Sequence, residues 1–226
     1  MENYRKALQE SYDVMWNSSK ESLLNNEINI DINLSNLEKD KRFGLTVLIP
    51  LGDIFLKVIN QLKEIEPEQY FYPATDTHIT IIDFIGASEE VVFDEEQIKI
   101  YKKILDEVLK DFSKFNLEFK GLTASKGAVM VQGFFNDELQ KLRERLREEV
   151  NGRGIELKER YKVGTAHSTI IRFKKKLQNP KALVNKIEKM RDIDLGTFEV
   201  KKILFVLHDW YNLKDKTKIL AEYELC

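Results

Sequence analysis

The sequence contains a single cysteine, Cys226, which is the last of its 226 residues. An intramolecular disulfide and a cysteine-rich metal site are therefore both excluded. A surplus of positive charge is also missing, because 36 lysines and arginines stand against 38 aspartates and glutamates, for a formal net charge of −2. Binding along a nucleic-acid backbone depends on such a surplus. The composition argues against a nucleic-acid coat protein, although a local positive site could still hold a small phosphate ligand or an RNA end.

Long apolar runs are absent as well. No stretch approaches the roughly 20 apolar residues of a membrane-spanning helix, and residues 1–16 are mixed polar, without the apolar centre of a signal peptide. We therefore expect a cytoplasmic protein without a membrane partner, and we expect a monomer.

Histidine is scarce, and its placement is informative. The chain has three histidines, and two of them open the similar segments HITIIDF (78–84) and HSTIIRF (167–173). Five of the seven positions are identical. A repeat of this kind predicts an internal duplication.

The hydrophobic pattern around the two segments supports a duplication. A strand at 43–50 and a helix over about 52–66 precede the first segment, and a strand at 127–135 and a helix after Asn136 precede the second. Each half then continues with a further helix and strand. The later strands are expected at 116–122, 198–207 and 216–225. Residues 1–24 look helical, and the Asn-rich segment after them is expected to be a loop or an irregular edge strand.

Strand alternation places histidine and threonine on one face of each segment. His78 and Thr80 would share a face with Ile82 and Phe84, leaving Asp83 on the opposite face. His167 and Thr169 would share a face in the second segment. Two histidines can serve as acid and base at a phosphodiester, because their pKa values lie near neutrality. Threonine hydroxyls can donate to the non-bridging oxygens, so no metal or other cofactor is needed.

HITI and HSTI match the H-x-T/S-hydrophobic motif, and the chain thereby resembles the two-histidine phosphoesterase superfamily, which includes RNA 2′,3′-cyclic phosphodiesterases, historically called 2′-5′ RNA ligases. The resemblance implies an α+β fold of two pseudo-symmetric lobes, with antiparallel sheets and flanking helices around a central cleft. It covers residues 43–226, with motifs at 78–81 and 167–170, and leaves 1–42 as an N-terminal helical extension.

The resemblance also implies roles for single residues. His78 and His167 resemble the catalytic acid and base, and Thr80 and Thr169 resemble the phosphate-binding hydroxyls. The second motif resembles the form with an arginine five residues after the histidine, here Arg172. Strict alternation places Arg172 away from His167, which leaves a structural ion pair as the alternative role. Which histidine is the base stays open.

Other residues are candidates with a structural alternative. Two strand histidines could bind zinc, but zinc normally needs a third protein ligand. Asp76 could be that ligand, or it could instead orient His78 or cap a turn. Tyr72 and Trp210 could stack on a base, or simply pack. His208 and Lys126 could lie at the cleft. Charged runs such as FKKK (173–176) and RERLREE (143–149) are expected to be solvated surface.

Together these observations predict a metal-independent phosphodiesterase that acts on a 2′,3′-cyclic phosphate of RNA or of a nucleotide. The alternatives are a phosphodiesterase for another cyclic or 2′-5′ linked nucleotide, and a non-catalytic module that binds a nucleotide or an RNA end. The expected partner is accordingly an RNA end or a small nucleotide substrate.

Overall fold

The computed structural model describes residues 2–226 as an α+β fold with two antiparallel sheets. The first half holds α1 (Glu2–Leu24), the short 3-10 turns η1 (Ile32–Ser35) and η2 (Leu37–Lys39), β1 (Phe43–Pro50), α2 (Leu56–Lys63), β2 (Tyr70–Phe71), β3 (His78–Ser88), α3 (Glu95–Leu109) and β4 (Phe115–Ser125). The second half holds β5 (Ala128–Phe135), α4 (Asp137–Gly152), β6 (Ser168–Arg172), α5 (Pro180–Lys189), β7 (Asp194–Val200), β8 (Lys202–Asp209), η3 (Lys214–Lys216) and β9 (Lys218–Glu224).

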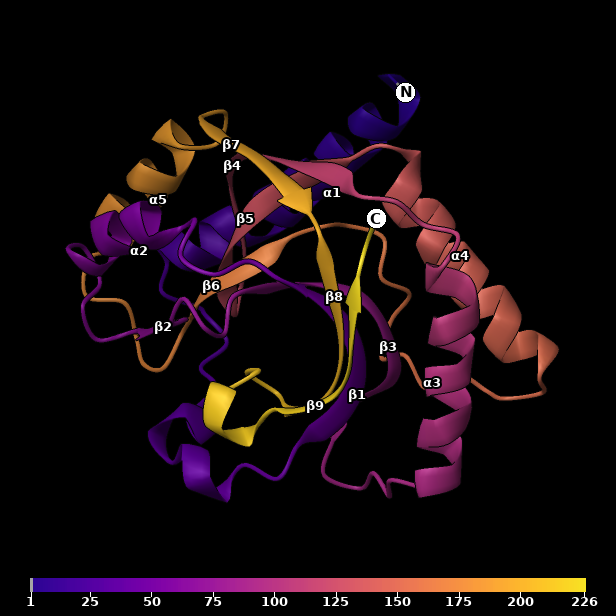
Figure 1. Ribbon diagram of the computed structural model, residues 1–226. Coiled ribbons are helices and arrows are strands. Elements are labelled where there is room, and N and C mark those ends of the chain that lie inside the picture. The colour runs from indigo at the N-terminus through magenta and orange to yellow at the C-terminus, as the bar shows by residue number, and fades with distance from the viewer. Residues whose placement is uncertain (1) are drawn as a thin grey trace.

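The two halves exchange strands. One sheet has the order β3-β1-β8-β9 and the other the order β2-β6-β5-β4-β7. Each half pairs its histidine strand with its own first strand, and gives a later strand to the first strand of the other half. In Figure 1 the sheet of β1, β3, β8 and β9 is strongly curled, and the second sheet, with β4, β5 and β6, lies beside it. This interleaving gives the two lobes a shared scaffold, so the motifs are held in fixed relation.

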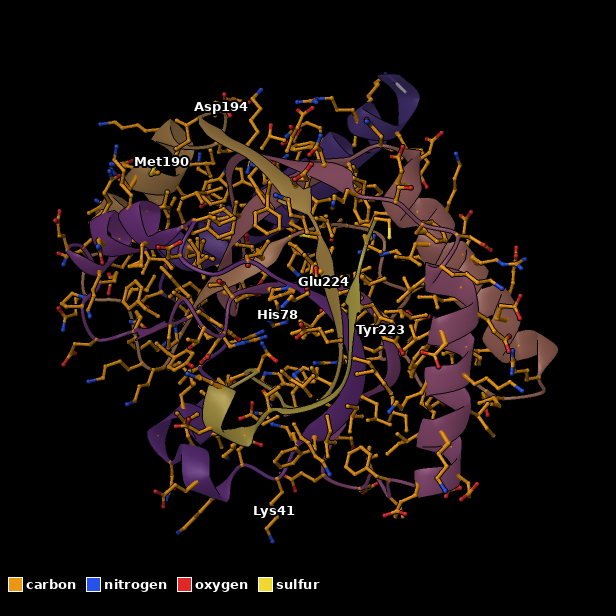
Figure 2. All side chains as sticks on the ribbon, in the orientation of Figure 1. Lys41, His78, Met190, Asp194, Tyr223 and Glu224 are labelled. Carbon is orange, nitrogen blue, oxygen red and sulfur yellow. The ribbon has the colours of Figure 1, made fainter. Side chains whose placement is uncertain are left out.

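Helices cover the outer faces of both sheets. In Figure 1, α3 and α4 lie together at one side of the molecule, and α2 and α5 lie at the other. The ring of Tyr101 on α3 stacks on Phe84 of β3 at 4.3 Å between centroids, which fixes α3 to the first sheet. Figure 2 shows His78 near the middle of the molecule, with Lys41 and Asp194 at its edge.

Helix α1 belongs to the hydrophobic core. It packs against β4, β5 and α5, and it buries Leu8, Tyr12, Trp16 and Leu23 in the same cluster as the strand residues. Among residues 2–226, no helix combines the length and the apolarity needed to cross a membrane.

Most expected elements are present, with three differences. The strand expected at 198–207 is two strands in different sheets, which meet at Lys201. The helix expected at 52–66 is regular only over 56–63. The Asn-rich segment is a loop that ends in η1, which agrees with the first of its two expected forms. The run RERLREE is not all solvated, because Arg143 is fully buried and Arg147 is 9% exposed.

Candidate active site

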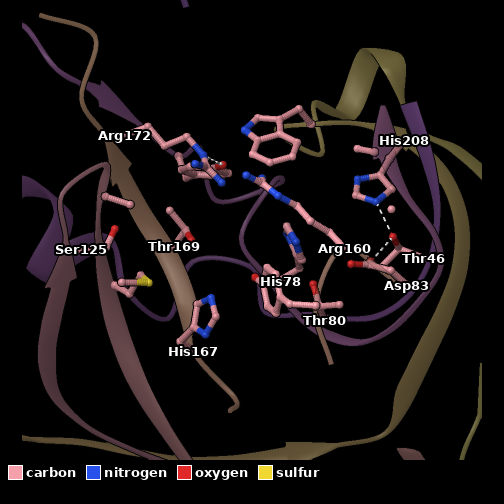
Figure 3. Close-up of a pocket in the computed structure, with 17 residues that line it drawn as sticks. Thr46, His78, Thr80, Asp83, Ser125, Arg160, His167, Thr169, Arg172 and His208 are labelled. Carbon is pink, nitrogen blue, oxygen red and sulfur yellow. Dashed lines mark hydrogen bonds between the residues drawn. The ribbon is translucent and has the colours of Figure 1, made fainter. Parts of the chain in front are cut away.

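The residues predicted to form the site meet in one cleft of about 350 Å³ between the two sheets. His78 and Thr80 enter from β3, and His167 and Thr169 come from β6 and the residue before it (Figure 3). Tyr72, Arg172, Trp210 and His208 also line this cleft. Asp76 and Lys126 do not. The side chain of Asp76 instead accepts hydrogen bonds from Thr75 and from the backbone of Lys214.

An irregularity after each threonine changes which side chains face the cleft. On β3 the pairing with β1 passes from Thr80 to Ile82 and leaves Ile81 as an extra residue. On β6 the pairing with β5 passes from Thr169 to Ile171 and leaves Ile170 as an extra residue. Such a bulge reverses the alternation beyond it.

The expected placement of the residues after the bulges was therefore wrong. Asp83 and Arg172, each five residues after a motif histidine, both line the cleft. Ile82 turns into the core with Phe84, and both are fully buried. The Nε of Arg172 donates to the hydroxyl of Tyr72 at 2.9 Å, and no carboxylate of the described residues forms a salt bridge with this guanidinium. The structural ion pair considered for Arg172 is therefore not formed.

The backbone fixes the orientation of His78. Its Nδ1 lies 2.8 Å from the carbonyl oxygen of Asp76. A carbonyl can only accept, so Nδ1 carries the proton and Nε2 is the nitrogen left for the cleft. Burial, the largest cause, lowers the pKa of His78, and this hydrogen bond opposes the decrease.

His167 is held by a side chain instead. Its Nδ1 lies 2.7 Å from the hydroxyl of Thr165, which again leaves Nε2 for the cleft. Burial, and after it the positive charge of Arg143, lowers the pKa of His167 to about 4. His167 is therefore neutral at physiological pH in the free protein.

Arg143 on α4 joins the two motifs from beneath. Its Nε donates to the carbonyl of Ile81 at 2.9 Å, and its Nη2 donates to the carbonyls of Thr80 and Thr165 at 2.8 Å each. The acceptors thus include the bulged residue of the first motif and the hydroxyl residue that holds His167. Burial lowers the pKa of Arg143 to about 10, so it remains charged at neutral pH. We infer that this side chain sets the spacing of the two motifs.

Tyr12 on α1 supports the second motif in a similar way. Its hydroxyl donates to the carbonyl of Gly133 at 2.7 Å and accepts from the amide of Ala166, next to His167, at 3.2 Å. Gly133 is required here, since a Cβ on it would lie 2.0 Å from the carbonyl oxygen of Ala166. Helix α1 therefore contributes to the geometry of the site.

A polar cluster forms the wall beside His78. The hydroxyl of Thr46 lies 2.7 Å from Oδ1 of Asp83 and 2.8 Å from Nε2 of His208 (Figure 3). The rings of His208 and His78 are 6.2 Å apart. Burial raises the pKa of Asp83, and it lowers the pKa of His208 to about 3. The wall thus presents a carboxyl group and a neutral imidazole to the cleft.

Sequence reasoning missed Thr46, Asp83, Arg143 and Arg160. The equal spacing of Asp83 and Arg172 from their histidines was the available signal for Asp83.

Among residues 2–226, no group of three or more histidine, cysteine, aspartate or glutamate side chains is placed to hold a metal ion.

Comparison with known proteins places this geometry in a fold. No family model matches the chain, and no curated protein matches it. Several solved structures, however, are similar to this chain. The TT0787 protein of Thermus thermophilus aligns with a TM-score of 0.59 at 14% identity, over 80% of this chain and 97% of that one. A protein described as a phosphoesterase aligns with a TM-score of 0.54 at 16% identity, over 83% of this chain and 99% of that one.

A third similar structure is LigT of Escherichia coli in complex with 3′-AMP, with a TM-score of 0.52 at 15% identity, over 82% of this chain and 98% of that one. At such identities a structural likeness establishes the fold. The α+β architecture that the resemblance implied is confirmed, and this chain shares the bilobal fold of these solved structures, one of which is described as a phosphoesterase.

Proposed function

We propose that this protein is a phosphodiesterase that opens a 2′,3′-cyclic phosphate of RNA or of a nucleotide. One observation carries the proposal: two histidines, each with Nδ1 already bonded, leave their Nε2 atoms for the same cleft beside two threonine hydroxyls. The bound 3′-AMP of the similar LigT structure supports a substrate of nucleotide size. The reaction needs an acid, a base and donors for the phosphate oxygens, and these side chains supply all three.

The surroundings of the histidines favour His167 as the base. Arg143 disfavours a positive charge on His167, whereas the carbonyl of Asp76 favours one on His78. In the proposed step, neutral His167 takes a proton from water as the water oxygen bonds to phosphorus. The negative charge of the bound phosphate raises the pKa of His78, and His78 is therefore protonated in the complex. It gives its Nε2 proton to the ribose oxygen as the bond from phosphorus to that oxygen breaks. The product is a phosphate monoester, and proton exchange with solvent restores both histidines.

Hydrolysis of adenosine 2′,3′-cyclic phosphate tests the proposal. General acid and base groups each contribute about 10²–10⁴ in rate. We therefore expect His78→Ala and His167→Ala each to lose at least a hundredfold in kcat/KM. EDTA should leave the wild-type rate unchanged, and Lys126→Ala, outside the cleft, is the control variant. Loss of activity in EDTA, or full activity in either histidine variant, would refute the mechanism. Binding of 3′-AMP without turnover would favour the non-catalytic module.

A further inference from the structure

Trp210 gathers three arginines at one end of the cleft. The guanidinium carbons of Arg42, Arg160 and Arg172 lie 4.6, 4.8 and 5.2 Å from the centroid of its ring. Arg160 comes from the loop between α4 and β6, and Arg172 comes from the end of β6. Positive charges repel each other, so three of them around one indole favour the binding of an anion.

Only one of the three charges is neutralised within the described residues. Arg42 forms salt bridges with Asp40 and, at 3.5 Å, with Asp31. The side chain of Arg160 has no salt bridge or hydrogen bond with any described residue. Arg172 uses only its Nε, for Tyr72. The Nη groups of Arg172 and the whole guanidinium of Arg160 are thus available as donors.

These free donors lie together at one end of the cleft that holds the two histidines. Figure 3 shows the guanidinium groups of Arg160 and Arg172 together at one end of the cleft, beyond His78 and Thr169 as seen from His167. The reacting phosphate must lie between the two histidines, where the threonine hydroxyls can reach it. A second anion could therefore occupy the arginine end at the same time.

We propose that Arg160 and Arg172 bind a second phosphate, attached to the 5′ oxygen of the nucleotide whose cyclic phosphate lies between the histidines. This inference rests on the proposed function and deepens it. Guanidinium groups bind phosphate through paired charge-assisted hydrogen bonds. Trp210, whose ring contacts the arginines, holds them in place. The preferred substrate is then an RNA 3′ end or a 5′-phosphorylated nucleoside cyclic phosphate, rather than a free cyclic nucleoside phosphate.

Equilibrium binding tests this subsite without requiring turnover. The affinities for adenosine 3′-monophosphate and adenosine 3′,5′-bisphosphate are compared by calorimetry in the wild type, Arg160→Gln and Arg145→Gln. Arg145 lies outside the cleft on α4, with its side chain 54% exposed, so this control makes the same change in net charge. We expect the wild type to bind the bisphosphate at least tenfold more tightly. This ratio should fall at least fivefold in Arg160→Gln and stay unchanged in Arg145→Gln.

Two results would overturn the inference. One is a wild-type affinity ratio close to one. The other is an equal weakening of both ligands in Arg160→Gln, which would assign Arg160 to the reacting phosphate. If the ratio behaves as expected but no cyclic phosphate is hydrolysed, the proposed function fails while the two-phosphate site remains.

Turnover then distinguishes the two sources of the second phosphate. We would compare adenosine 2′,3′-cyclic phosphate, its 5′-phosphorylated form, and the dinucleotide ApA ending in a 2′,3′-cyclic phosphate. A preference of at least tenfold for the dinucleotide would identify an RNA end, and the same preference for the 5′-phosphorylated mononucleotide would identify a small nucleotide. Equal kcat/KM for all three would count against a role of the subsite in the reaction.

Discussion

Replacing Arg143 by methionine should destabilise the protein and shift the pH dependence of its activity. The side chain is fully buried and donates three hydrogen bonds, to the carbonyls of Thr80, Ile81 and Thr165. Methionine has a similar length but no donor. A buried carbonyl that loses its donor costs about 1–3 kcal/mol. We therefore expect the free energy of unfolding to fall by at least about 3 kcal/mol.

The positive charge of Arg143 should also affect the pH dependence of kcat/KM. Arg143 is one of the causes that hold the pKa of His167 at about 4. Removing its positive charge raises this pKa. Since the proposed base must be neutral, the acidic limb of kcat/KM should move to higher pH in Arg143→Met. Arg143→Lys keeps the charge but cannot reach all three carbonyls, so it should lose stability while the acidic limb stays in place.

Urea unfolding at pH 7 and kcat/KM for a 2′,3′-cyclic nucleotide between pH 4 and 8 measure the two effects. The pair of variants separates the contribution of the charge from that of the geometry. An acidic limb at the same pH in Arg143→Met and wild type would refute the electrostatic argument. A loss of less than about 1 kcal/mol in the methionine variant would refute the structural one.

Three further predictions concern single positions. Thr169→Val should lower kcat by about a hundredfold, as expected for the loss of one donor to a phosphate oxygen. The urea midpoint should stay close to that of the wild type, because Thr169 makes no side-chain hydrogen bond with a described residue. A wild-type rate in this variant would exclude the donor role. His208, with a pKa of about 3 when folded and about 6.5 when unfolded, binds more protons in the unfolded state, so the protein loses stability as the pH falls through 6.5. Between pH 7 and pH 5, the free energy of unfolding measured in urea should fall by about 2 kcal/mol less in His208→Gln than in the wild type. An equal fall in the two proteins would contradict the low pKa of His208 in the folded state. Gly133→Ala should lower the free energy of unfolding by about 1–3 kcal/mol and should also lower kcat/KM, because the added Cβ would displace Ala166 beside His167. Unfolding and kinetics like those of the wild type would show that the close approach of Gly133 to Ala166 is dispensable.

The sequence was sufficient for the two motifs and for most of the strands around them, because both depend on local patterns. It was insufficient for the side chains beyond each threonine. Alternation assumes a regular strand, whereas the bulges at Ile81 and Ile170 depend on how β1 and β5 pair with the motif strands. Pairing register is a long-range property. The faces of Asp83 and Arg172 were therefore wrongly predicted, although their equal spacing was visible.

Arg143 shows a second limit of local reasoning. It belongs to a highly charged run, RERLREE, which is typical of a solvated helix face. Only the assembled fold brings the carbonyls of Thr80, Ile81 and Thr165 next to α4, where they accept hydrogen bonds from the guanidinium of Arg143. In the same way, the contact of Tyr12 with Ala166 joins residues 154 positions apart. No periodicity in the sequence encodes either contact.

The different side chains at the fifth position of the two motifs, acidic in the first and basic in the second, give the cleft a direction. A site with identical halves would accept a phosphodiester in either orientation, because each histidine and threonine has an equivalent partner. Asp83 on one wall disfavours a phosphate, and Arg172 on the other attracts one. One orientation should therefore dominate, and the same ribose oxygen should face His78 in nearly every turnover. We expect the wild type to release one product isomer, the 2′- or the 3′-phosphate, in at least a tenfold excess. Asp83→Asn removes the repulsion and should lower that excess, which phosphorus NMR or chromatography of the products would measure. A mixture of both isomers from the wild type would show that the asymmetry does not orient the substrate.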